Sequence, residues 1–329
     1  MSETANIAAM AEKISEEIFK YFKWDISDFK DIDFECVNKE GHAKKKTHPS
    51  DVVFSYLDPY KNTRIYLNTD LKSFSANTIS KQKVESALCS LAIAVSCACI
   101  SGEWQEKFLN SQEERWEAHG LLFIYNHDNE YTGDFGKLYS DTASVDKILH
   151  DGVRLYVMGP KEILRLYNVA IDLKLLKADD VIGGPDSYTF FYPDLVLSKT
   201  HGNEWSHAAT YDALFAGWTI IKYRTSKSKS GIGYLVYYFR EGSEIDEFLY
   251  LIDALSHFQI LSGDNEVHVR LYSASSGAIN NFKKGCEKYL LSWGDDPGHK
   301  KRIGAIKINK MADMAKKFEA NELPGDGNV

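Results

Sequence analysis

A hairpin-like segment constrains the fold more than any other part of this 329-residue chain. Residues 51–57 and 64–72 read as two β-strands, and the segment Asp58-Pro-Tyr-Lys-Asn62 between them reads as a tight turn. The pattern therefore predicts two antiparallel neighbours within a sheet.

Charged residues stand at defined places on this predicted hairpin. Asp51 opens the first strand, and the second strand ends in Asp70-Leu-Lys72. Side chains two residues apart on a strand point to the same face, so Asp70 and Lys72 share one face. If the strands pair around the turn, Asp51 comes near Asp70. Two carboxylates beside one lysine suit a divalent metal and an attacking water, so phosphodiester cleavage is the leading hypothesis.

Composition sets limits on this hypothesis. The chain is 44% hydrophobic and 26% charged, which is typical of a globular protein with one large or two ordinary domains. Its net charge of -8 argues against a surface covered with basic residues, which sequence-independent nucleic-acid binding draws upon. An acidic nuclease then needs a local basic patch, a metal ion, or a partner that holds the substrate.

The five cysteines indicate a reducing, cytoplasmic setting. Their number is odd and no C-x-x-C pair occurs, so they do not read as a disulfide framework or as a metal site. Cys97 and Cys99 lie in an apolar helical run, where we interpret them as small core residues. The apolar stretch at residues 87–100 is too short to span a bilayer, and the N-terminus lacks a signal-peptide pattern, so no membrane association is expected.

The remaining pattern predicts an α/β (α+β) protein with two domains. In the first half we expect helices at residues 6–22, 80–100 and 160–176, strands at 31–38, 120–126 and 153–158, and an acidic mobile segment at 103–117. In the second half we expect strands at 188–198, 219–224, 234–239 and 266–272, and helices at 208–218, 243–261 and 276–292. The predicted divisions are a first domain at 1–177, an α/β sandwich at 186–310 and a disordered polar tail at 311–329. No internal repeat is visible.

The order helix, three strands, helix, strand, with these charged residues, resembles the PD-(D/E)xK or restriction-endonuclease-like superfamily over roughly residues 6–126. The resemblance implies a mixed-sheet core with flanking helices, in which Asp51 and Asp70 hold Mg²⁺ or Mn²⁺ and Lys72 orients the attacking water. It also implies a contribution from a glutamine or lysine of the following helix, for which Gln82 and Lys81 or Lys83 are the candidates. A first-helix glutamate, here Glu16 with Glu12 and Glu17 as alternatives, would join the metal. Lys81, Lys83 and Lys45 are the candidates for contacts with nucleic acid.

The Asp-x-Lys motif alone is a poor signal. It occurs also at Asp28-Phe-Lys30 and Asp172-Leu-Lys174, and only the copy at Asp70 is predicted to lie on a strand that follows an Asp-bearing strand. The alternative is an exposed edge hairpin with ordinary surface charges. Other polar groups are expected to be structural: His127 with Asp128, Asp194, the loop residues His201, Glu204 and His207, and the basic loop with Arg224, Lys227 and Lys229.

Two functions remain open at this point. The first is a DNA-cleaving, metal-dependent nuclease of a bacterial antiphage or restriction system that works with a partner such as a helicase or sensor. The second is a catalytically inactive, nuclease-like interaction or sensor subunit of a larger complex.

Overall fold

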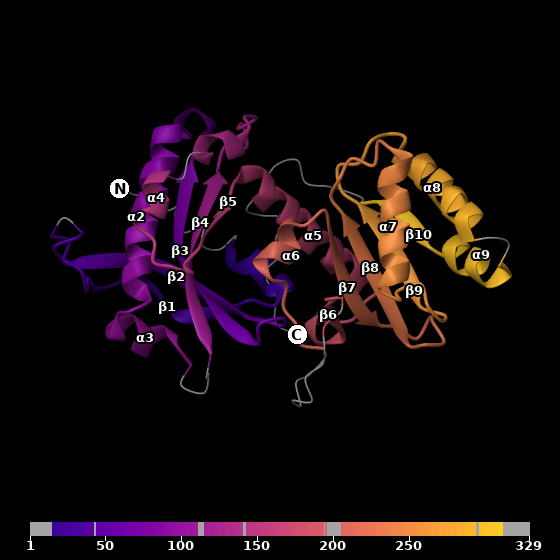
Figure 1. Cartoon of the computed structure of the whole chain (residues 1–329), viewed down its shortest axis with the longest axis horizontal. Coiled ribbons are helices and arrows are strands. Elements are labelled where there is room, and N and C mark those ends of the chain that lie inside the picture. Colours follow the sequence, from indigo (N-terminus) through magenta and orange to yellow (C-terminus); the bar gives the residue numbers. More distant parts are fainter. Residues whose placement is uncertain are drawn as a thin grey trace. The chain divides into compact units, whose positions relative to one another are not determined.

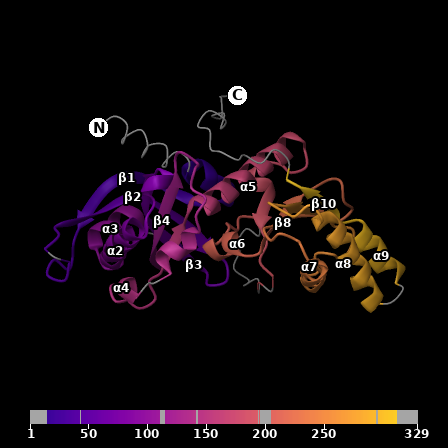
Figure 2. The ribbon, with the colours of Figure 1, turned by 90° about the horizontal axis from the view of Figure 1, so that it is seen from above.

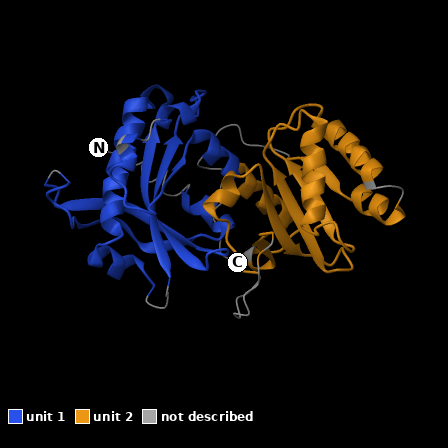
Figure 3. Cartoon of the chain, in the orientation of Figure 1, with its two compact units in different colours: residues 1–167, 315–329 blue, residues 168–314 orange. Residues whose placement is uncertain are grey.

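A computed structural model describes residues 15–42, 44–110, 115–140, 143–193, 195, 205–293 and 296–311. These residues form two compact units, one ending at Tyr167 and the other beginning at Asn168, each built on its own five-stranded sheet (Figures 1 and 3). The division falls inside helix α5 (Pro160–Ala178), whereas the sequence placed the end of the first domain at 177.

The sheet of the first unit is mixed, as predicted. Its strands are β1 (Asp25–Glu35), β2 (Thr47–Asp58), β3 (Thr63–Phe74), β4 (Trp116–Asn126) and β5 (Leu155–Met158), in that spatial order. The β1–β2 and β2–β3 pairs are antiparallel, and the β3–β4 and β4–β5 pairs are parallel. The predicted hairpin is confirmed, and β5 rather than β4 forms the edge of the sheet.

Helix α2 (Lys81–Ala98) follows the hairpin, close to its predicted bounds. It begins where the Ser80 side chain accepts a hydrogen bond from the backbone N–H of Lys83. Leu88 and Leu91 pack in one buried cluster with Leu122 of β4, so α2 covers one face of the sheet. The other helical segments of this unit are residues 15–19, η1 (Lys20–Phe22), η2 (Ala76–Thr78), α3 (Gly102–Phe108), η3 (Phe135–Tyr139) and α4 (Ala143–Asp146). Residues 6–14 of the predicted first helix lie outside the described residues.

The prediction of a mobile segment at 103–117 is wrong for residues 103–108, whereas residues 111–114 lie outside the described residues. Its first part folds as α3 because Trp104 is fully buried and its Nε1–H donates to Oδ1 of Asn68 on β3, at 3.1 Å. Phe108 is also buried, four residues later on the same face of the helix. Only two large apolar residues anchor this short helix, so its sequence carries little periodic signal.

Strand β1 begins at Asp25, several residues before the predicted start at 31. Asp28 and Lys30 therefore also lie on a strand, but no described strand precedes β1, so the copy at Asp70 is still the one that follows an Asp-bearing strand. The β1–β2 register shifts between Ile26 and Lys30, and Asp31 has a φ of 48°. This irregular backbone explains why the segment shows no clear alternation in the sequence.

The second unit is an α/β sandwich, as predicted. Its strands are β6 (Tyr188–Phe190), β7 (Trp218–Arg224), β8 (Ile232–Tyr238), β9 (Glu266–Leu271) and β10 (Lys307–Lys310), in the spatial order β10-β9-β8-β7-β6. Its helical elements after α5 are η4 (Pro185–Ser187), α6 (Tyr211–Phe215), α7 (Ile245–His257), α8 (Ala278–Trp293) and α9 (Pro297–Gly304). Of the elements of this unit, η4, α9 and β10 were not predicted, and α6 is shorter than the helix expected at 208–218.

Helices cover both faces of this second sheet (Figures 1 and 2). Tyr238 of β8 packs against Phe248 of α7, with ring centroids 5.2 Å apart. The next residue back, Tyr237, points to the opposite face and donates a hydrogen bond from its hydroxyl to Asp172 of α5 at 2.9 Å. Asp172 also forms a buried ion pair with Arg270 of β9, which explains the third Asp-x-Lys copy as structural. Met311, assigned to the polar tail, is buried and donates its N–H to the carbonyl of Leu271.

The two sheets have the same topology, which the sequence did not reveal. In each unit three successive strands pair antiparallel, and two later strands add in parallel beyond the third strand. In each unit a long helix, α2 or α7, connects the third strand to the fourth along the chain. The strands β7 and β8, which correspond to β2 and β3, contain no aspartate or glutamate.

No single helix among the described residues is long and apolar enough to cross a membrane. The pair α2 and α3, bent by 87°, passes that length and composition test only when the two are taken together.

Candidate functional site

Strand register brings three carboxylates into one row across the first sheet. Val52 pairs with Thr69 in the antiparallel β2–β3 ladder, so the preceding residue Asp51 stands opposite Asp70. On its other side, β1 pairs Lys30 with Val52 and Ile32 with Ser50, so Asp31 stands opposite Asp51. Directly opposite residues on paired strands have Cβ atoms about 4.5–5.5 Å apart, so Asp51 has an acidic neighbour on each side.

The carboxylate of Asp51 is partly buried and held in place. Its Oδ2 accepts a hydrogen bond from the backbone N–H of Leu71, at 2.7 Å. Burial raises the pKa of Asp51 to about 6, and the negative charges of Asp70 and Asp31 also raise it. The Leu71 N–H and the charge of Lys72 act in the opposite direction without offsetting the rise. The ionised form of this carboxylate therefore lacks full compensation from the described protein groups, which favours a nearby cation.

Lys72 lies beside Asp70, as the alternation predicted. Its Nζ forms an ion pair with Oδ1 of Asp70, and the two side chains are 37% and 18% exposed. The pair lies near the carboxyl end of β3 and is partly exposed to solvent. Asp51, Asp70 and Lys72 thus form one group on two neighbouring strands.

The first turn of α2 stands near the same strand end. Lys83 places its Nζ 5.2 Å from the ring centroid of Phe74, the last residue of β3. Lys81 and Gln82 are exposed on the same turn, and Lys81 pairs with Glu85 at 3.5 Å. Two lysines and a glutamine therefore project from the helix that follows the Asp-x-Lys strand.

Comparison with known proteins agrees with this geometry. Residues 1–162 match a family model described as the PD-(D/E)XK nuclease domain of the GAPS4 protein. This segment belongs to the PD-(D/E)XK nucleases. The match reaches the start of α5, farther than the resemblance read at 6–126. No curated protein matches the chain.

Not every residue that the sequence singled out gathers with Asp51, Asp70 and Lys72, which are called the Asp51 group below. Glu16 forms an ion pair with Lys30 of β1, and the further acid whose charge acts on Asp51 is Asp31. The sequence reasoning missed Asp31, although it opens the strand predicted at 31–38, because strand pairing is not visible in a sequence. Lys45 is exposed in the loop before β2, where its N–H donates to the carbonyl of His42 at 3.0 Å.

Several other polar candidates have structural partners. Asp128 accepts hydrogen bonds from the N–H groups of Ala76 and Glu130, so it stabilises turns beside the first sheet. His127 lies 3.2 Å from the hydroxyl of Ser73, measured from Nδ1. In the second unit, the Arg224 guanidinium lies 4.5 Å from the ring of Trp205. Asp194, His201 and Glu204 lie outside the described residues.

The donor atoms of the Asp51 group fit a hard divalent cation. Asp51 and Asp70 supply carboxylate oxygens, and the carbonyl of Leu71 between the two charged residues is a further oxygen donor. Mg²⁺ and Mn²⁺ prefer such oxygen ligands together with water. The strongest indication of a cation here is Asp51, because its carboxylate is partly buried and its negative charge is only partly offset by neighbouring protein groups.

Proposed function

We propose that this chain is a metal-dependent nuclease that cleaves DNA phosphodiester bonds, with Asp51, Asp70 and Lys72 as catalytic residues. The observation that carries the proposal is the placement of Asp51 opposite Asp70, with Lys72 paired to Asp70 on the same face, inside a PD-(D/E)XK nuclease domain. This geometry supports hydrolysis because the charges needed at a phosphodiester converge at one place on a rigid sheet.

Asp51 and Asp70 would hold Mg²⁺ or Mn²⁺, and Glu16 remains the proposed first-helix ligand, although it pairs with Lys30 here. When bound, the ion would supply a Lewis acid that lowers the pKa of a water molecule and neutralises phosphate charge. Lys72 would position the attacking water and stabilise negative charge on the phosphate oxygens. The Leu71 N–H fixes the orientation of the Asp51 carboxylate, and Gln82 would orient the substrate from the first turn of α2.

Lys81, Lys83 and Lys45 would contact the phosphates that flank the scissile bond. Their local positive charge matters because the chain as a whole carries a net charge of -8. We infer that a partner protein, such as a helicase or sensor, delivers the DNA or restrains cleavage. The GAPS4 family is a defence-system family, which supports a role in bacterial antiphage defence.

The test is a cleavage assay on plasmid and linear DNA, with RNA as a second substrate, in buffers containing Mg²⁺, Mn²⁺ or EDTA. We expect the purified chain, alone or with the product of a neighbouring gene, to cut DNA with Mg²⁺ or Mn²⁺ and not with EDTA. Replacing Asp70→Ala or Lys72→Ala removes groups that act on the reacting phosphate, so the rate should fall by about 100-fold or more.

The matched control is Asp28→Ala. Asp28 belongs to another Asp-x-Lys on a strand of the same sheet, but it is exposed and lies outside the Asp51 group. Its replacement should leave the rate unchanged. Cleavage that survives Asp70→Ala would contradict the proposal, as would loss of cleavage in Asp28→Ala to the same extent.

The alternative is a non-catalytic interaction subunit. The second unit favours such a role for its own half of the chain, because β7 and β8 repeat the nuclease topology without any carboxylate. Absence of cleavage under all the conditions above, with folded protein and its genomic partners present, would select this alternative for the whole chain.

A further inference from the structure

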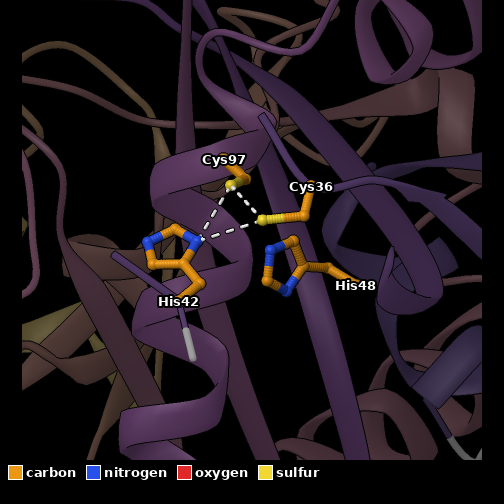
Figure 4. A group of neighbouring side chains, drawn as sticks. All are labelled: Cys36, His42, His48 and Cys97. Carbon is orange, nitrogen blue, oxygen red and sulfur yellow. Dashed lines mark hydrogen bonds between the residues drawn. The ribbon is translucent and has the colours of Figure 1, made fainter. Parts of the chain in front are cut away.

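Four side chains of the first unit converge at one place (Figure 4), and of these the sequence analysis interpreted only Cys97, as a small core residue. Cys36 follows β1, His42 lies in the next loop, His48 lies on β2, and Cys97 lies near the end of α2. One nitrogen or sulfur atom from each residue lies within 4.8 Å of the corresponding atom of every other. This cluster is separate from the Asp51 group, since it shares no residue with it.

The three distances among Cys36, His42 and Cys97 match the edges of a metal-centred tetrahedron. The two sulfur atoms of Cys36 and Cys97 are 3.8 Å apart, and Nδ1 of His42 lies 3.4 Å and 3.3 Å from them. Zinc binds thiolate sulfur at about 2.3 Å and imidazole nitrogen at about 2.0–2.1 Å, so tetrahedral geometry gives edges of about 3.8 Å for S–S and about 3.5 Å for S–N. A disulfide would require the sulfur atoms about 2.05 Å apart, so these two thiols are not bonded to each other.

His48 gives a second, independent observation. Its side chain is only 1% exposed, and neither ring nitrogen has a hydrogen-bond partner among the described residues. Burying an imidazole without partners is unfavourable, because its polar atoms lose their hydrogen bonds to water. A metal ion at the centre of the cluster would give one of these nitrogens a ligand bond.

We propose that Cys36, His42, His48 and Cys97 form a structural zinc site of the Cys₂His₂ type. Two sulfur and two nitrogen donors in a tetrahedral arrangement select Zn²⁺ over Mg²⁺ or Ca²⁺, which prefer oxygen. Four protein ligands complete the coordination shell and leave no position for a substrate, so the zinc would hold structure and not catalyse a reaction.

The proposed zinc would join three parts of the nuclease unit. It would link the end of β1 and the start of β2 to the carboxyl-terminal part of α2, and it would close the loop that carries Lys44, Lys45 and Lys46. His48 stands three residues before Asp51 on the same strand, so the site would also fix the beginning of the strand that carries this acid. The sequence analysis missed the cluster because its two cysteines are separated by more than sixty residues, unlike the short C-x-x-C spacing that signals such sites.

The test uses the full-length chain, purified without added metal and analysed for metal content by mass spectrometry. We expect about one zinc per chain, and replacement by Co²⁺ should produce the strong visible absorption of tetrahedral cobalt with a thiolate-to-cobalt charge-transfer band. Cys36→Ser and Cys97→Ser should each lower the zinc content severalfold and weaken that band. The double variant Asp51→Ala, Asp70→Ala should keep both, which separates this site from the nuclease site.

Cys99→Ser is the matched control. Cys99 lies two residues beyond Cys97, but its thiol is directed to the carbonyl of Ala118 at 3.6 Å. This variant should bind zinc and cobalt like the unchanged protein. Because the Cys36 and Cys97 variants can fail to fold, the unchanged chain provides a test of its own. If it purifies without zinc and gives no thiolate-to-cobalt band, the proposal is overturned. It is overturned equally if Cys36→Ser and Cys97→Ser fold and keep full zinc content.

Discussion

At the scale of single residues, the carboxylate of Glu266 on β9 contacts Lys307 on β10, Tyr223 on β7 and His268 on β9. Its Oε1 accepts from Nζ of Lys307 on β10 at 2.7 Å, and its Oε2 accepts from the hydroxyl of Tyr223 on β7 at 3.1 Å. Burial alone would raise the pKa of Glu266, but the hydrogen bonds from Lys307 and His268 outweigh burial and lower it to about 2. The ionised carboxylate therefore stabilises the folded second unit.

This shift predicts how stability depends on pH. An unfolded glutamate has a pKa of about 4.3, so the contribution of Glu266 is complete above that value and is lost as the pH falls from about 4.5 to about 2. Glu266→Gln should therefore be less stable than the unchanged chain at pH 7, and the difference should shrink across that window. Urea unfolding at several pH values measures it. Asp264→Asn, an exposed carboxylate two residues away, is the control, and an equal effect there would contradict the prediction.

At the scale of elements, the sequence predicted those whose pattern is local. The strands β2 and β3, with the turn between them, and the capped helix α2 all carry their signals within a few residues, and the structure confirms them. Helix α3 was missed because its stability comes from a distant contact, the hydrogen bond of Trp104 to Asn68. The irregular start of β1 was missed for the same reason, since only pairing with β2 makes it a strand.

The packing of α2 against β4 depends on a glycine. A Cβ added to Gly120 on β4 would overlap the side chain of Leu155 on β5 and lie 3.0 Å from Cγ of Leu91 on α2. Gly120→Ala should destabilise the chain by about 1–3 kcal/mol, because both leucines must move within a packed core. Urea unfolding followed by tryptophan fluorescence measures the change.

Gly102→Ala is the control for that substitution. Gly102 is the first residue of α3, and a Cβ there would meet no heavy atom within 4 Å. Its replacement should be neutral or should stabilise the chain by about 0.4–1 kcal/mol, since alanine restricts the unfolded chain more than glycine does. Equal losses of stability in the two variants would show that packing at Gly120 is not the cause.

At the scale of the whole molecule, the structure shows a relation between the halves that the sequence did not. Both units have the same strand order and directions, yet no repeat is visible in the sequence, because many residue combinations can satisfy one pattern of burial. The carboxylates on the second and third strands differ outright, being present on β2 and β3 and absent from β7 and β8. The Asp51 group could be predicted because two of its members, Asp70 and Lys72, lie two residues apart in the sequence. The proximity of Asp31 and the cluster of Cys36, His42, His48 and Cys97 depend on long-range contacts, which a single sequence does not show.

The proposed DNA binding must be reconciled with a net charge of -8, and this can be tested. If affinity comes from a few lysines beside the nuclease site, Lys81→Ala with Lys83→Ala should weaken binding and make it less dependent on salt. Each lost phosphate contact reduces the slope of log K against log salt by about 0.9, so the expected reduction is about 2. Fluorescence anisotropy with labelled duplex DNA, measured in EDTA to prevent cleavage, gives this slope.

The control removes the same number of positive charges from another part of the chain. Lys283→Ala with Lys284→Ala removes two exposed lysines from α8 in the second unit, so both double variants carry a net charge of -10. Overall charge acts over long distances and would weaken binding equally in both variants. Local phosphate contacts would weaken it only in the α2 variant, where the lysines project beside the end of β3. Equal slopes in the two variants would therefore contradict a DNA-binding role for the first turn of α2.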